Sequence, residues 1–361
     1  MKKNVLINMV IVTMTLFGLF FTYFSCTPNT EENKSTSESL YPAYYYNREI
    51  FVSVNYIFNN EGLYQPVMIR QNPLTKELFV LDKGNTCIYV FSLEGQFVRK
   101  IGRPGQGPGD LLKPEYIAFD NEGNLYVYEA GNYRFSIFSK EGKFIYSFRN
   151  INSVSNVVFT ITNKKEIAAF IRKRDHYLTI FSRNGDIVKD IGEIKHYNDN
   201  IPALNETYAE LSSILEVNGK YVIFLRHLPM VKIIDKSGKL LQEKLLNKEL
   251  EITSFHDPNT LKISVHRRII LDAIYRFNNY YVFIHEFYPN NPDAEKVNFQ
   301  IYVLNEEFNT IRKIYLPIEE PLSRIKSYPR STFSYQFEVI TENDDILLIL
   351  MPNTEIYRYY R

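Results

Sequence analysis

The chain has 361 residues, enough for one large domain or two small ones. Its 42 Lys and Arg residues balance 41 Asp and Glu residues, and the net charge of +1 supplies no global field that would attract nucleic acid or an anionic surface. Two cysteines, Cys26 and Cys87, are too few for a disulfide framework. Aromatic side chains make up 15% of the residues, a composition that favours half-buried β-strands.

The first 39 residues have the pattern of an export signal followed by a polar tether. Lys2 and Lys3 precede an apolar run over residues 5–24, which ends at Ser25-Cys26. This order resembles a bacterial lipoprotein signal, in which a cysteine after a small residue becomes lipidated and N-terminal. The resemblance implies a signal peptide over 1–25, a flexible tether over 26–46 and a folded domain over 47–361. It also implies a cell-envelope protein held to the outer membrane by lipid on Cys26, facing the periplasm or the surface.

An uncleaved signal anchor is the alternative, because the apolar run is nearly long enough to span a bilayer. In either case the folded domain itself need not touch lipid. Cys87 is then expected to be a small buried residue without a disulfide partner.

Two neighbouring segments repeat each other at an offset of about 47 residues. The run LFVLDKGN at 78–85 aligns with LYVYEAGN at 125–132, and FSLEG at 91–95 aligns with FSKEG at 138–142. This period is typical of a four-stranded β-propeller blade. In the second unit we expect strands at 117–119, 125–128, 135–138 and 144–148, separated by tight Gly-containing turns.

Four further units keep the same order of strands and turns. Their expected strands are 157–161, 167–171, 177–181 and 187–191; 213–217, 221–225, 231–234 and 240–245; 269–275, 280–285, 299–304 and 310–316; and 336–340, 346–350 and 355–359. The sixth unit lacks one strand, and residues 48–56 (REIFVSVNY) are the candidate to complete it. Such pairing would close the ring and remove two open sheet edges. The sequence therefore predicts an all-β, six-bladed β-propeller closed by an N-terminal strand.

The second unit resembles an NHL repeat. It carries a Gly-rich connection at 102–110, then Pro114, IAFD at 117–120, GNLYV at 123–127, and Asn132, Arg134 and Phe138. Glu129 stands where that family usually has Asp, and Tyr116 where it often has Gly. With the leader, the chain resembles the six-bladed propeller lipoproteins of Bacteroidetes, of the broader TolB-like shape. That resemblance supplies no catalytic residues.

The connections after the second strand of each unit and between units are long, whereas the others are tight turns. Long loops carry function more often than tight turns, so we expect binding on the long-loop face. The residues that follow the second strands should ring the channel mouth there. The candidate ligand-binding residues are Glu129, Arg134, Arg172, Arg174, Asp175, Arg226, His227, His285 and Glu286. For Asp82, Asn85, Glu129, Asn132 and Arg134 the competing interpretation is structural, because polar residues that recur in a repeat usually brace strands.

Motifs of catalysis are absent from the sequence: no HExxH, GxSxG, CxxC or Walker-type loop occurs. We therefore predict no catalytic residues, no cofactor and no metal, and a binding module for an unidentified ligand or envelope protein. The alternative is a metal-dependent hydrolase or lactonase with metal in the central channel, for which Glu129, Asp175 and Glu286 are the candidate ligands. Separately, His227 and His285 could meet across the channel and hold a metal with Glu286. Nucleic-acid binding, which some NHL propellers perform, is disfavoured by the balanced charge.

Overall fold

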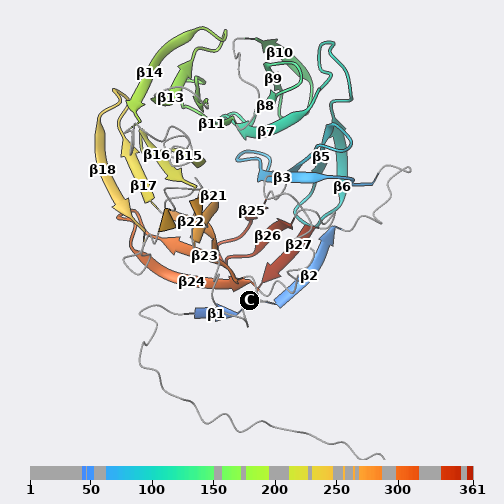
Figure 1. Ribbon diagram of the computed structural model, residues 1–361. Coiled ribbons are helices and arrows are strands. Elements are labelled where there is room, and N and C mark those ends of the chain that lie inside the picture. Colours follow the sequence, from blue (N-terminus) through green and yellow to red (C-terminus); the bar gives the residue numbers. More distant parts are fainter. Residues whose placement is uncertain are drawn as a thin grey trace, which may run out of the picture. The chain divides into compact units, whose positions relative to one another are not determined.

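A computed structural model of the chain describes thirteen segments (Figure 1). They are residues 43–45, 47–52, 62–149, 157–171, 176–194, 211–226, 230–246, 255–256, 263–264, 268–286, 298–316, 335–350 and 356–360. All of them belong to the compact unit Ser39–Arg361. The predicted signal peptide, Cys26 and the first part of the predicted tether lie outside the described residues. No helix long and apolar enough to cross a membrane occurs among the described residues.

The first three blades are four-stranded antiparallel sheets in which sequence neighbours pair. Blade 1 contains β3 (Pro66–Gln71), β4 (Leu78–Asp82), β5 (Cys87–Phe91) and β6 (Phe97–Ile101). Blade 2 contains β7 (Pro114–Phe119), β8 (Leu125–Glu129), β9 (Arg134–Phe138) and β10 (Phe144–Phe148). Blade 3 contains β11 (Val158–Ile161), β12 (Ile167–Phe170), β13 (His176–Phe181) and β14 (Ile187–Glu193). The predicted strands agree with these bounds to within a few residues.

The last three blades follow the same plan, with the longest strands in blade 5. Blade 4 contains β15 (Leu211–Val217), β16 (Lys220–Leu225), β17 (Met230–Ile234) and β18 (Leu240–Leu245). Blade 5 contains β21 (Arg268–Arg276), β22 (Asn279–Glu286), β23 (Asn298–Leu304) and β24 (Thr310–Leu316). Blade 6 contains β25 (Tyr335–Val339), β26 (Ile346–Leu350) and β27 (Ile356–Tyr360). A small hairpin of β19 (Phe255–His256) and β20 (Ile263–Ser264) lies between blades 4 and 5.

The innermost strands close a ring around a central axis. Strand β3 contacts β7, β7 contacts β11, β11 contacts β15, β15 contacts β21, β21 contacts β25, and β25 returns to β3 (Figure 1). The prediction of a six-bladed β-propeller is confirmed.

Strand β2 (Asn47–Val52) completes blade 6 by pairing antiparallel with β27, with Arg48 opposite Tyr359. This confirms the predicted closure by an N-terminal strand, which ties the start of the propeller to its end. Strand β1 (Ala43–Tyr45) adds to blade 5, parallel to β24. The sequence did not predict β1, which lies in the segment expected to be a tether. It covers the outer edge of blade 5.

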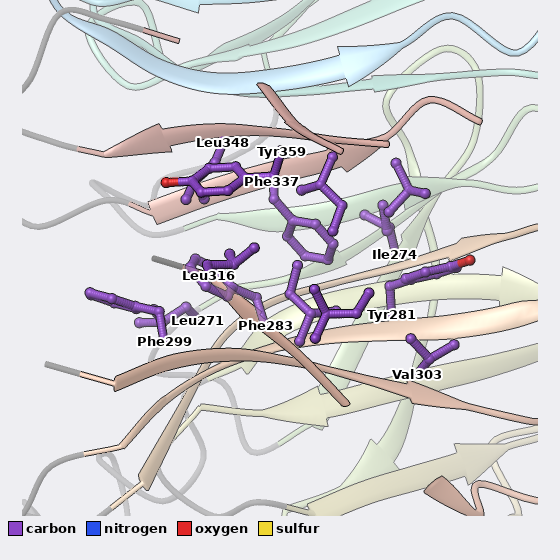
Figure 2. Close-up of a cluster of buried hydrophobic side chains, with 14 residues drawn as sticks. Leu271, Ile274, Tyr281, Phe283, Phe299, Val303, Leu316, Phe337, Leu348 and Tyr359 are labelled. Atoms are coloured by element: carbon purple, nitrogen blue, oxygen red, sulfur yellow. The ribbon is translucent and has the colours of Figure 1, made fainter. Parts of the chain in front are cut away.

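The apolar core lies between neighbouring blades, and each junction has its own cluster of buried side chains. Between blades 5 and 6, Phe283 and Phe337 are both fully buried, with ring centroids 5.6 Å apart. Figure 2 shows them with Tyr359, Leu316 and the other residues of this cluster. Burying one such ring stabilises the fold by about 1.5–3 kcal/mol. Cys87 begins β5 and is 1% exposed, as predicted for a small buried residue.

Candidate functional site

Asp82 ends β4, on the face of the propeller that carries the long connections. Its carboxylate accepts hydrogen bonds from the backbone N–H groups of Tyr64 at 2.7 Å, Gln65 at 3.0 Å and Asn85 at 3.0 Å. The Asn85 amide donates to the carbonyl of Gly62 at 2.7 Å. Both residues therefore brace the segment that leads into blade 1, as the structural interpretation predicted.

Glu129 occupies the same position at the end of β8 and is fully buried. It accepts hydrogen bonds from Leu112 N–H at 2.9 Å, Asn132 Nδ2 at 2.6 Å, Arg134 Nε at 2.8 Å and Ser136 Oγ at 2.5 Å. Four donors satisfy both carboxylate oxygens, so this charge is held without help from solvent.

Arg134 links Glu129 to the Gly-rich connection between blades 1 and 2 through hydrogen bonds. Its guanidinium donates to the carbonyls of Gln106 at 3.0 Å, Gly107 at 3.2 Å and Asp110 at 2.6 Å. Gly105 is required there, because a Cβ at that position would lie 2.4 Å from the Asp110 carboxylate. Glu129 and Arg134, two predicted binding residues, thus meet in a buried corner and direct their polar atoms at the chain itself. A role for them in ligand binding stays a prediction.

The remaining predicted binding residues are described only in part. Arg172, Arg174, Asp175 and His227 lie outside the described residues. His285 and Glu286 end β22, and only their backbone is described, with His285 paired to Ile269 and Glu286 to Arg268. The carbonyl of Arg226 accepts a hydrogen bond from Ile270 N–H at 2.9 Å, which links blades 4 and 5. For these residues ligand binding remains a prediction.

A polar cluster that was not predicted from the sequence lies among the innermost strands. Arg70 on β3 reaches across blade 6, and its Nη2 lies 3.0 Å from both carboxylate oxygens of Asp272 on β21. Arg70 Nη1 also donates to the carbonyl of Phe337 at 3.2 Å. Asp272 accepts a further hydrogen bond from Ser213 Oγ on β15 at 2.9 Å. Four blades are thereby joined through a few buried polar atoms.

Burial and charge act against each other in this cluster. Burial raises the pKa of Asp272, and the ion pair with Arg70 and the Ser213 hydrogen bond offset only part of that rise. Burial alone would lower the pKa of Arg70, but Asp272, Tyr116 and Glu338 raise it above its usual value. Burial also raises the pKa of Tyr116 on β7 to about 12, while the Arg70 cation opposes the rise. Arg70 therefore stays charged and the Tyr116 phenol stays neutral at physiological pH.

Glu338 on β25 forms a second group beside the first. One of its oxygens accepts hydrogen bonds from Gln71 N–H and from Arg276 Nη2, both at 2.9 Å. Glu338 is fully buried, whereas the Arg276 side chain is 29% exposed. Blades 1, 5 and 6 are joined by this carboxylate. We call Arg70, Tyr116, Ser213, Asp272 and Glu338 the axial cluster. The hydrogen bonds described above join these side chains to one another and to the backbone of the chain, so the cluster acts as a brace between blades.

The signal for the axial cluster was present in the sequence as charges inside apolar strands. Arg70 stands in PVMIRQ, Asp272 in RIILDAIYR and Glu338 in YQFEV. A charge flanked by core residues is buried only when a partner is available. Across the described ranges, no group of three or more His, Cys, Asp or Glu side chains is arranged to hold a metal ion. The hydrolase alternative therefore stays a prediction.

Comparison with known proteins supports the propeller over most of the chain. The family model DUF5128, described as a 6-bladed beta-propeller, matches residues 71–210. A putative exported protein of Bacteroides fragilis superposes with a TM-score of 0.54 at 13% identity, over 88% of this chain and 98% of that one. Virginiamycin B lyase of Staphylococcus aureus superposes with a TM-score of 0.51 at 11% identity, over 88% and 99%. These identities show a shared fold alone.

One curated relative, Protein brain tumor of Drosophila melanogaster, is 23% identical over 159 residues. The aligned segment covers 42% of this chain and only 14% of that protein. Ring closure, blade composition and these similarities agree: the chain is a six-bladed β-propeller, and its residues 71–210 match the DUF5128 model of such propellers.

Proposed function

We propose that this protein is an exported, lipid-anchored propeller that binds a ligand or an envelope protein through its long-loop face. The observation that carries the proposal is the contrast between the two faces. On one face the strands are joined by tight turns. The successive blades are separated by longer stretches of sequence, between Ile101 and Pro114, between Glu193 and Leu211 and between Leu316 and Tyr335. Long connections on a rigid scaffold are the usual place for recognition.

The tight turns on the opposite face repeat one geometry. The N–H groups of Gly95, Gly142, Gly185 and Gly238 each donate to the carbonyl three residues earlier, at 3.0–3.1 Å in three blades and 2.8 Å in blade 2. Such self-contained turns leave little backbone free for a partner.

Two exposed tyrosines on the long-loop face add to the case. Tyr64, ahead of β3, is 68% exposed, and Tyr133, between β8 and β9, is 45% exposed. Aromatic side chains are enriched at protein interfaces because they combine a large apolar area with a polar end. Lys83, just after β4, and Glu115, near the start of β7, form a loose ion pair at 3.9 Å. The fold of the exported Bacteroides fragilis neighbour is consistent with a role outside the cytoplasm.

Site-specific photocrosslinking tests which face binds. A photoactivatable amino acid replaces either Tyr133, on the long-loop face, or Leu74, which is 52% exposed in the tight turn between β3 and β4. We expect ultraviolet-dependent adducts in the producing cells from position 133 and none from position 74. Adducts from position 74 alone would overturn the assignment.

The anchor is tested separately by metabolic labelling with a palmitate analogue. We expect the wild-type chain to take up label and to sediment with membranes, because the Ser25-Cys26 pattern is that of a lipoprotein signal. Cys26→Ser should abolish both. Label that persists in Cys26→Ser would contradict lipidation at this cysteine.

A further inference from the structure

Exposed aliphatic side chains recur where the outer strands leave the tight turns. The outer strands β6, β10, β14, β18 and β24 each have a β-bulge at the second residue. That residue is aliphatic and exposed in all five strands: Val98, Ile145, Val188, Leu241 and Ile311. Of these five strands, β14 and β18 alone also expose the residue before the bulge, Ile187 and Leu240. Blades 3 and 4 therefore present twice as many exposed aliphatic side chains at this place as the other three.

The outer strands of blades 3 and 4 are neighbours on the perimeter of the ring (Figure 1). Lys189 Nζ on β14 donates to the carbonyl of Lys236, in the turn that leads into β18. We call Ile187, Val188, Leu240 and Leu241, which are 40–52% exposed, the blade 3–4 rim. Exposed apolar groups that gather beside polar residues are typical of interaction surfaces.

The tight turns of blades 3 and 4 are basic, whereas those of the other blades are acidic. Between their strands, the tight turns of blades 3 and 4 carry five Lys or Arg and three Asp or Glu residues. Those of blades 1 and 2 carry three and five, and the described tight turns of blades 5 and 6 carry none and five. Lys164, Arg183 and Lys239 are exposed, and we call them the turn cations. A nearly neutral chain thus has a positive sector beside the blade 3–4 rim.

The chain enters the propeller from the side of the tight turns. Strand β1 is parallel to β24, with Ala43 opposite Lys313 and Tyr45 opposite Tyr315. Because β24 begins just after the tight turn at 305–309, Ala43 is the end of β1 nearer to the tight-turn face. Cys26 lies 17 residues before Ala43, and a flexible linker of that length has a root-mean-square span of about 20–25 Å. Lipid on Cys26 would therefore bring a membrane close to the tight-turn side of blade 5, which is next to blade 4.

We propose that the blade 3–4 rim docks onto a lipid surface with anionic headgroups. Its four aliphatic side chains enter the boundary between headgroups and acyl chains, and the turn cations contact lipid phosphates. The proposal rests on the proposed lipid anchor only for the approach to the membrane. In this orientation the long-loop face points away from the lipid and stays open to a partner.

A single tryptophan tests which part of the ring touches lipid, because the chain contains no Trp of its own. Leu241→Trp places the probe in the blade 3–4 rim. Val98→Trp places it at the same bulge position in blade 1, on the opposite side of the ring. The full chain with either substitution is bound to vesicles of phosphatidylcholine and phosphatidylglycerol with brominated acyl chains. We expect about twofold or stronger quenching for Leu241→Trp than for Val98→Trp, because a docked apolar side chain reaches the acyl boundary.

Charge variants in the Leu241→Trp background test the contribution of the turn cations. Lys164→Glu/Lys239→Glu should reduce the quenching by about half or more, and so should replacing phosphatidylglycerol by phosphatidylcholine, because both remove an attraction between opposite charges. The matched control is Lys76→Glu/Lys143→Glu, which makes the same charge change at exposed tight-turn positions of blades 1 and 2. We expect this control to be quenched like Leu241→Trp alone.

The anchor and the docking surface fail in different measurements. The N-terminal apolar run or its lipid binds the vesicle in every variant, so vesicle binding itself is not the measure. A wrong anchor appears as missing palmitate label. An unquenched Leu241→Trp on vesicles that carry the chain, or equal quenching at positions 98 and 241, would overturn the docking. Equal losses from the two charge pairs would mean attraction by overall charge and would overturn the assignment to blades 3 and 4.

Discussion

Two buried arginine–carboxylate pairs show two ways in which this propeller is held together. Glu129 and Arg134 lie five residues apart in one blade and fasten the adjacent Gly-rich connection. Arg70 and Asp272 lie 202 residues apart and join blades 1 and 5. Both carboxylates are fully buried. The carboxylate of the first pair recurs in blade 1 as Asp82, although Cys87 stands at the position of Arg134, and the pair stabilises a loop. The second pair joins two distant blades and stabilises the ring.

The comparison predicts that breaking the axial pair has the largest effect. Arg70→Met leaves the Asp272 carboxylate buried without its cation, and we expect the free energy of unfolding to fall by about 3–5 kcal/mol. Urea denaturation of the variant and the wild type measures this fall. Adding Asp272→Leu to Arg70→Met removes the stranded charge and should recover part of the loss. No recovery in the double variant would show that the pair does not act as a unit.

A smaller and more local effect is expected from Glu129→Gln. The amide group would place donors against Asn132, Arg134 and Leu112, which now donate to the carboxylate. We expect a loss of about 2 kcal/mol, together with faster hydrogen exchange confined to residues 102–113. Uniformly faster exchange around the ring would remove the distinction between the local and the axial pair.

The pH dependence of stability should have opposite signs for two carboxylates. Burial raises the folded-state pKa of Asp272, so the folded chain binds this proton more tightly than the unfolded chain. Stability from this group is therefore present below the ordinary carboxyl pKa of about 3.9 and falls as the pH rises toward the raised value. The Arg99 hydrogen bonds lower the pKa of Glu77, so its contribution is present above the ordinary pKa and is lost as the pH falls.

Urea midpoints measured across the acid range in wild type, Asp272→Asn and Glu77→Gln test these signs. In the wild type, the Asp272 carboxyl makes stability fall as the pH rises, and Asp272→Asn should remove this fall. The Glu77 carboxyl makes stability rise with pH, and Glu77→Gln should remove this rise. Slopes of the same sign for both substitutions would contradict the assignment.

The smallest effect is expected from Arg103→Ala. Arg103 pairs with Asp110 at 2.7 Å in the same Gly-rich connection that Arg134 holds, but its side chain is 79% exposed. Exposed pairs contribute little because water screens them. We expect an unchanged urea midpoint, and a clear drop would show that the connection depends on its outer pair as well as on the Glu129–Arg134 corner.

Much of the architecture could be predicted because it is periodic. The 47-residue offset between repeated segments predicted the blades and their strands. The sixth unit lacked one strand in the sequence, which predicted that an N-terminal strand would pair with the last blade, as residues 47–52 do. The bracing by Asp82 and Asn85 was equally accessible, since both recur at fixed positions. Strand β1 was missed because a short parallel addition to an outer edge leaves no pattern in the chain.

The sequence by itself determined the number of blades, the strands within them and the corners that brace each connection, because these depend on residues close together in the chain. Only the tertiary structure decided which charges meet at the axis. Closure of the ring brings Arg70 to Asp272, and no local pattern in the sequence specifies that pair.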